Sequence, residues 1–69
     1  MKEGLTQKQA DVYNAIMEFK INNGYPPTLV ELSQILKKST GAIRSCMRIL
    51  QRKKFIEIEK YKKRAIKLK

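Results

Sequence analysis

The sequence has no histidine and a single cysteine, Cys46. A disulfide framework within the chain and a zinc site with Cys and His ligands are both excluded, because each needs several such residues. There is no glycine-rich phosphate loop, and the six acidic residues stand at spacings that form neither a paired-carboxylate site nor a metal cage. We therefore expect no enzyme activity, no metal, no cofactor and no small-molecule substrate.

Long apolar runs are missing as well. No stretch approaches the roughly 20 residues that a bilayer-spanning helix needs. Residues 1–9 are too polar for a secretory signal peptide. We expect no membrane partner, and a protein of a reducing cytoplasm, which the lone cysteine also suits.

Positive charge is concentrated in the second half of the chain. Residues 1–36 carry three lysines and four acidic residues, a net charge of −1, whereas residues 37–69 carry thirteen basic and two acidic residues, a net charge of +11. With 69 residues and 42% apolar composition the chain suits one folded domain, residues 1–69. A polarised charge attracts and orients a polyanion, so nucleic acid is the first partner to consider.

Capping signals predict where three helices begin. Thr6 with Gln9 and Thr28 with Glu31 have the spacing of capping boxes, which start helices at about residues 6–22 and 28–37. Ser39 or Thr40 can cap a third helix at about residues 40–53, after only a tight turn. The second and third helices therefore form a helix-turn-helix.

Each predicted helix has an apolar stripe at helical spacing. The stripes are Val12, Ile16 and Phe19 in the first helix, Leu32, Ile35 and Leu36 in the second, and Ile43, Met47 and Leu50 in the third. After the third helix the hydrophobic period changes from helical spacing to alternation, because Ile56 and Ile58 alternate with glutamates. This predicts a β-hairpin over residues 55–69 with its turn at residues 60–63. The fold class predicted is mainly α with a small β-hairpin, a three-helix winged helix-turn-helix.

One set of motifs makes the prediction more specific. These motifs are Leu5-Thr6, Gln9, the run Asn23-Gly24-Tyr25-Pro26-Pro27-Thr28, Glu31-Leu32, and the run Leu50-Gln51-Arg52-Lys53-Lys54-Phe55-Ile56-Glu57-Ile58. Over nearly the whole chain they resemble the DNA-binding domain of LexA repressors. The resemblance implies sequence-specific binding of duplex DNA, with the third helix in the major groove and the hairpin, or wing, against the backbone or an adjacent groove. It also implies a bacterial, nucleoid-associated regulator of transcription.

The chain departs from that family at the start of its third helix. A typical repressor reads Ser-Pro-Asn-Ala-Ala-Glu-Glu where this chain has residues 39–45, and only Ser39 and Ala42 are retained. Gly41 has no side chain to bond a base, and Arg44 places a donor fork suited to guanine where the family has a carboxylate. We expect a repressor with altered operator specificity. LexA repressors continue into a dimerising, self-cleaving domain, whereas this sequence ends at Lys69. We therefore expect a stand-alone small protein without that domain, such as a regulator of a phage or other mobile element.

Two sets of candidate contacts follow from this reading. The residues expected to read bases are Ser39, Thr40, Gly41, Ala42, Arg44, Ser45 and Arg48. Those expected to contact phosphates are Thr28, Lys37, Lys38, Arg52, Lys53, Lys54, Lys60, Lys62, Lys63 and Arg64. Simpler roles stay open for several of them: helix capping for Thr28, compensation of the helix dipole for the cations at residues 52–54, and solubility for those of the wing.

Two other functions remain open at this point. The fold could instead bind a protein, such as a host repressor or an RNA polymerase subunit, or it could bind nucleic acid without sequence preference. On DNA a monomer of this size covers one half-site, so a homodimer on DNA or a partner protein is a further expectation.

Overall fold

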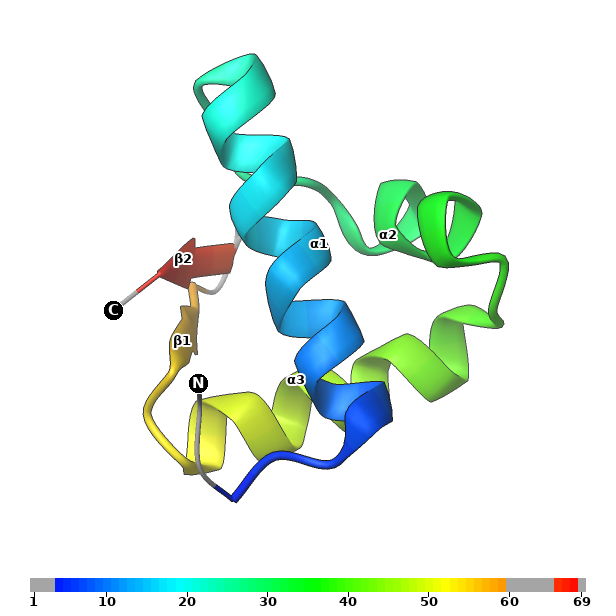
Figure 1. Ribbon diagram of the computed structural model, residues 1–69, viewed down its shortest axis with the longest axis vertical. Helices are drawn as coiled ribbons and strands as arrows, with labels where there is room; N and C mark the ends of the chain where they lie inside the picture. Colours follow the sequence, from blue (N-terminus) through cyan, green and yellow to red (C-terminus); the bar gives the residue numbers. More distant parts are fainter. Residues whose placement is uncertain (1–3, 60–65, 69) are drawn as a thin grey trace.

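The computed structural model describes residues 4–59 and 66–68 and shows three helices followed by two short strands (Figure 1). Helix α1 is Gln7–Asn23, α2 is Leu29–Leu36 and α3 is Thr40–Arg52, and the strands are β1, Ile56–Ile58, and β2, Ile66–Leu68. The strands pair antiparallel, with Glu57 opposite Lys67. The predicted fold class, a mainly helical winged helix-turn-helix, is confirmed. No helix in the described ranges has the length and apolarity to cross a membrane.

The helix starts are fixed by side chains close in the sequence. The Thr6 hydroxyl accepts from the Gln9 N–H at 3.3 Å, and the Gln9 side chain accepts from the Thr6 N–H at 3.1 Å. Thr28 and Glu31 form the same reciprocal pair, at 3.1 and 2.8 Å. Both predicted capping boxes are thus confirmed. Of the two caps considered for α3, Ser39 is the one used: its hydroxyl accepts from the Ala42 N–H at 3.2 Å.

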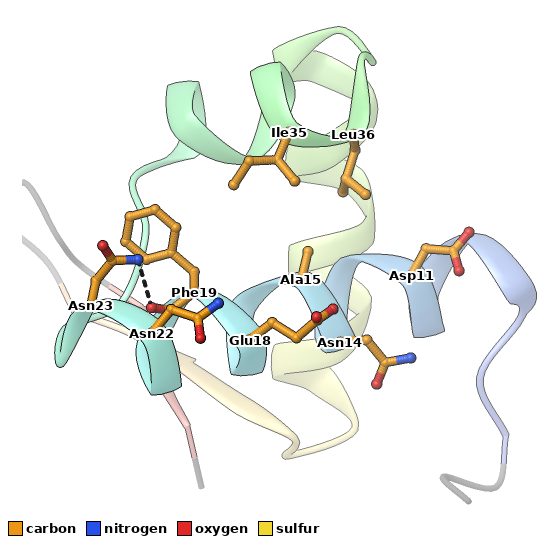
Figure 2. Close-up of a pocket in the computed structure, with 9 residues that line it drawn as sticks. All are labelled: Asp11, Asn14, Ala15, Glu18, Phe19, Asn22, Asn23, Ile35 and Leu36. Carbon is orange, nitrogen blue, oxygen red and sulfur yellow. Dashed lines mark hydrogen bonds between the residues drawn. The ribbon is translucent and has the colours of Figure 1, made fainter.

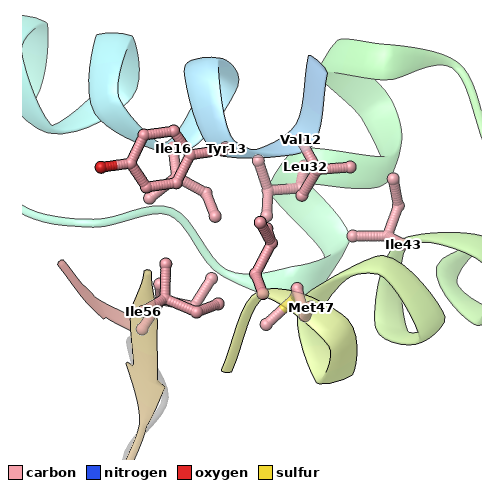
Figure 3. Close-up of a cluster of buried hydrophobic side chains, with 9 residues drawn as sticks. Val12, Tyr13, Ile16, Leu32, Ile43, Met47 and Ile56 are labelled. Atoms are coloured by element: carbon pink, nitrogen blue, oxygen red, sulfur yellow. The ribbon is translucent and has the colours of Figure 1, made fainter. Parts of the chain in front are cut away.

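The core lies where the three helices and the strand pair meet (Figure 3). Its fully buried aliphatic side chains come from every helix and from β1: Val12, Ile16, Leu32, Ile43, Leu50 and Ile56. Each such side chain contributes about 1.5–3 kcal/mol when it leaves water. Because the buried set of the described residues contains no polar or charged side chain, almost all the specificity of packing comes from shape.

The burial of three side chains differs from what the apolar stripes indicated. Tyr13, which belongs to no predicted stripe, is buried at 5% exposure and packs against Phe55 with ring centroids 5.6 Å apart. Phe19, expected in the buried stripe, is only partly buried, and its ring meets Tyr25 edge-on at 5.9 Å. Ile35, expected to face inward, is 50% exposed. The eight-residue α2 buries Leu32 completely, whereas Ile35 lines a groove with polar residues of the C-terminal end of α1.

The ends of the helices use the left-handed backbone conformation. Gly24 ends α1 at φ 81°, a region that glycine enters without steric cost. Lys37 after α2 and Lys54 after α3 adopt it as well, at φ 55° and 66°. At each of these two ends a backbone hydrogen bond joins residues five apart. The Lys38 N–H donates to the Ser33 carbonyl at 3.0 Å, and the Phe55 N–H donates to the Leu50 carbonyl at 2.9 Å. In this conformation the Cβ atom comes too close to the following carbonyl oxygen, so each of the two lysines destabilises the fold locally.

The strain at Lys54 predicts a stabilising substitution. Lys54→Gly is expected to raise the free energy of unfolding by about 0.5–1 kcal/mol, because it removes the Cβ clash of the left-handed conformation. The measurement is urea denaturation followed by circular dichroism. Lys54→Ala removes the same charge but keeps the Cβ, so it should give no such gain. An equal gain for both variants would show that charge, and not backbone strain, is responsible.

Candidate nucleic-acid interface

Helix α3 has one buried face and one exposed basic face. Ile43, Met47 and Leu50 are buried against the rest of the domain, and α3 contacts α1, α2 and β1. The side chains on its opposite side are exposed: Thr40, Ala42, Arg44, Ser45, Arg48, Gln51 and Arg52, with Gly41 among them. The residues predicted to read bases thus lie together on the solvent-facing surface of α3, from its N-terminus onward.

A hollow on one flank of α3 joins four elements. It is lined by residues from the start of α2, from α3 and from both strands, among them Thr28, Leu29, Arg44, Arg48, Ile58 and Ile66. The tertiary structure therefore brings Thr28 beside the two arginines, although 16 residues separate Thr28 from Arg44 in the sequence. The apolar side chains give this hollow a floor, and the guanidinium groups give it a positive edge.

The other flank of α3 adds a cation that sequence reasoning missed. Lys8 of α1 lines a hollow together with Lys38, Ser39, Ala42 and Ser45. Lys8 belongs to the half of the chain whose net charge is close to zero, so the charge distribution did not point to it. Only the packing of α1 against α3 brings Lys8 to this place. Basic side chains of α1 and of the turn before α3 therefore border this flank of α3.

Two of the predicted phosphate-contacting residues already hold contacts within the protein. Thr28 uses its N–H and its hydroxyl in the capping box, and the Glu31 carboxylate stands at that helix start, where it compensates the helix dipole and disfavours a second anion. The Lys53 ammonium donates to the carbonyl of Gly4. Both residues therefore have structural roles, and their contact with phosphate stays a prediction.

The remaining predicted cations divide into two groups. Lys37, Lys38, Arg52 and Lys54 are exposed, and Arg52 shares a shallow hollow with Arg48 and Gln51. The residues assigned to the wing tip, Lys60, Lys62, Lys63 and Arg64, lie outside the described residues. Lys67 on β2 is exposed, and sequence reasoning did not include it. Within residues 4–59 and 66–68, no group of three or more Cys, Asp or Glu side chains is arranged to hold a metal ion.

A side-chain hydrogen bond ties β1 to α3. The Ile58 N–H donates to the side-chain oxygen of Gln51 at 2.9 Å. Gln51 is exposed on the same helix surface as Arg48 and Arg52, so the bond fixes β1 relative to the basic face. The sequence offered no signal for this contact, because the two residues belong to different elements.

These features define a winged helix-turn-helix whose third helix is held by α2 and the strand pair and exposes a basic surface. The family model of the LexA DNA binding domain matches residues 2–65. The chain therefore belongs to the LexA DNA-binding domain family, as the motifs of its sequence indicated.

The relatives that the chain resembles are LexA repressors from several bacteria. The repressor of Clostridium perfringens strain SM101 is 33% identical over 64 residues, which make up 91% of this chain and 32% of the relative. The repressor of Anaeromyxobacter dehalogenans strain 2CP-1 is 34% identical over 65 residues, 93% of this chain and 28% of the relative. That of Desulfatibacillum aliphaticivorans is 40% identical over 65 residues, 93% of this chain and 32% of the relative. The chain spans about a third of the length of these curated relatives.

Removal of the Gln51 side chain tests whether it anchors the wing. Gln51→Ala leaves the Ile58 N–H without its acceptor, and we expect a loss of about 0.5–1.5 kcal/mol of stability with faster hydrogen exchange at the Ile58 amide. Amide exchange measured by NMR checks this. Gln34→Ala, a matched change at an exposed position of α2, should leave the Ile58 amide as it is. Unchanged protection in Gln51→Ala would mean that strand pairing alone holds the wing.

Proposed function

We propose that this chain binds duplex DNA in a sequence-specific manner and regulates transcription in the bacterial cytoplasm, as a repressor that occludes a promoter. The observation that carries the proposal is the exposed face of α3, with Arg44, Arg48 and Arg52 on it and Lys8 and Lys38 along one flank. Membership in the LexA DNA-binding domain family supports it. So do the names of the relatives, which are repressors.

Base readout would come from the first two turns of α3. A helix of this diameter fits the major groove of B-DNA, and the side chains near its N-terminus reach the base edges. Arg44 has the fork of donors that pairs with O6 and N7 of guanine. Gly41 contributes no side chain there, so the helix backbone comes close to the bases without reading one. We therefore propose an operator that differs from the one typical of LexA repressors.

Phosphate contacts would come from cations beside α3 and on the wing. Lys8 and Lys38 border the N-terminal half of α3, and the exposed Lys67 of β2 would supply a further contact from the wing. Such contacts neutralise phosphates and release counterions, which supplies affinity that does not depend on sequence. They also hold the duplex in register over Arg44 and Arg48.

This mechanism predicts a steep dependence on salt. With about five to eight phosphate contacts, log K should fall with log salt at a slope of about −4 to −7, measured by fluorescence anisotropy on a labelled duplex. Lys8→Gln should make the slope shallower by about 1 and weaken binding to all sequences alike. Lys20→Gln, near the other end of α1, serves as the control and should leave the slope unchanged. A flat salt response of the wild-type chain would contradict the proposal.

Arg44 predicts a particular change in sequence preference. Selection of bound sequences from a random DNA library should give a consensus, and Arg44→Ala should lose the preference for guanine at one position, at a cost of about 1–3 kcal/mol for the preferred site. The operator typical of LexA repressors should compete poorly with the selected site. Equal competition by both, or the same consensus for wild type and Arg44→Ala, would contradict altered readout by α3.

The same selection addresses how many copies bind. A palindromic consensus with half-sites one helical turn apart would indicate a homodimer on DNA, because symmetric operators mirror symmetric proteins. A single half-site would indicate a monomer or a complex with a different protein. We propose paired binding, since one domain of this size covers one half-site only.

A further inference from the structure

A groove between α1 and α2 has a character opposite to that of the rest of the protein. It is lined from α1 and α2 alone, so no residue of α3 or of the strands takes part in it. In Figure 2, Ile35 and Leu36 point from α2 towards α1, while Ala15 and Phe19 point back from α1. This groove can therefore be occupied without displacing anything bound to the exposed face of α3.

Four apolar side chains line the groove, together with the side-chain amides of Asn14, Asn22 and Asn23. Ala15 is small and leaves room between the helices, and Leu36 and Phe19 are partly buried beside it. Ile35 is 50% exposed, whereas Leu32 of the same helix is fully buried. The Phe19 ring is supported from behind by Tyr25. An exposed aliphatic side chain next to an aromatic ring is a surface that gains from being covered.

The rim of the groove is acidic. Asp11 and Glu18 stand on α1 on either side of Ala15, seven residues apart, which is two helical turns or about 10.5 Å along the axis. Asp11 accepts from the neutral side-chain amide of Gln7 at 2.8 Å, which leaves its charge uncompensated. Glu18 forms no ion pair with any described residue, and none of the lining residues is Lys or Arg. In a chain of net charge +10 this is a local negative site.

We infer that the groove between α1 and α2 is a docking site for a basic amphipathic helix of a partner protein. A helix with Lys or Arg at positions i and i+7 places its cations over Asp11 and Glu18. Leucines at i+3 and i+4 of that helix then fall between them and cover Ala15 and Ile35. This is the helix-in-groove mode of recognition, in which apolar anchors supply affinity and flanking charges supply orientation.

A second copy of this chain does not offer the complementary surface. None of its described helices has basic residues at i and i+7: the arginines of α3 are spaced by four and eight residues, and α1 carries only Lys8 and Lys20. A second copy would also bring a further net charge of +10 close to the first. The charge pattern therefore favours a different protein as the occupant.

The test is an NMR titration of the full 15N-labelled chain with a synthetic 14-residue helical peptide. This peptide carries Lys at two positions seven apart and Leu at the third and fourth positions after the first Lys, and a control peptide has Glu in place of both Lys. The Lys peptide is expected to shift the amide signals of Ala15, Glu18 and Ile35 with saturation, while the Glu peptide leaves them in place. Shifts on α3 or the strands with none in the groove would overturn the proposal.

Variants separate the groove from general charge effects. Glu18→Gln should weaken binding of the Lys peptide about threefold to fivefold, as expected for one partly exposed ion pair. Glu57→Gln changes the net charge equally, on β1 outside the groove, and should leave the affinity within about twofold. Equal effects of the two substitutions would overturn the proposal.

Ile35→Ser tests the apolar part of the site and the identity of the occupant. Since Ile35 is half exposed, the variant should keep the dispersed amide spectrum of the folded chain and lose the saturable shifts in the groove. Retained shifts would count against an apolar anchor. Sedimentation of the wild-type chain provides the other arm: a dimer that Ile35→Ser dissociates would identify a second copy as the occupant and overturn the inference of a different partner. None of these results depends on whether the chain binds DNA.

Discussion

Because α3 buries Ile43, Met47 and Leu50 in the core, the side chains that it exposes to solvent are fixed. These three residues lie on one side of α3, and their contacts with α1, α2 and β1 fix the rotation of the helix about its axis. The consequence is that Arg44, Arg48 and Arg52 all face outward. The apolar core of this small domain thus does more than stabilise it, because it also orients the surface on which the proposed function depends.

The two faces of the molecule share α1 but divide its residues. Lys8, in the first turn of α1, stands beside Lys38 and the start of α3 and extends the basic surface. Asp11 and Glu18, further along the same helix, face α2 and border the groove with the exposed Ile35. A helix turns by about 100° per residue, so a few positions suffice to move a side chain from one face to the other. One helix thereby contributes to both a positive surface and a negative groove.

Much of the fold could be predicted because its signals are local. A capping box joins residues three apart, and the pairs Thr6–Gln9 and Thr28–Glu31 form as their spacing indicated. The alternation of Ile56 and Ile58 with glutamates likewise predicted β1. The exposure of Ile35 could not be predicted, because its position in an apolar stripe is the same whether or not a neighbouring helix covers it. Which side chains α1 presents at that point depends on how the two helices cross.

For the candidate site, the sequence by itself determined the kind of surface and the tertiary structure decided its members. The spacing of the arginines on α3 and the motifs shared with LexA repressors were sufficient to identify a basic third helix and the family. Lys8 joined that surface, Gln51 became the anchor of Ile58, and Thr28 came to lie beside Arg44 only through packing. The physical reason is distance along the chain: caps and helical stripes are set by bonds between near neighbours, whereas contacts between elements are set by how an apolar core closes over the whole chain.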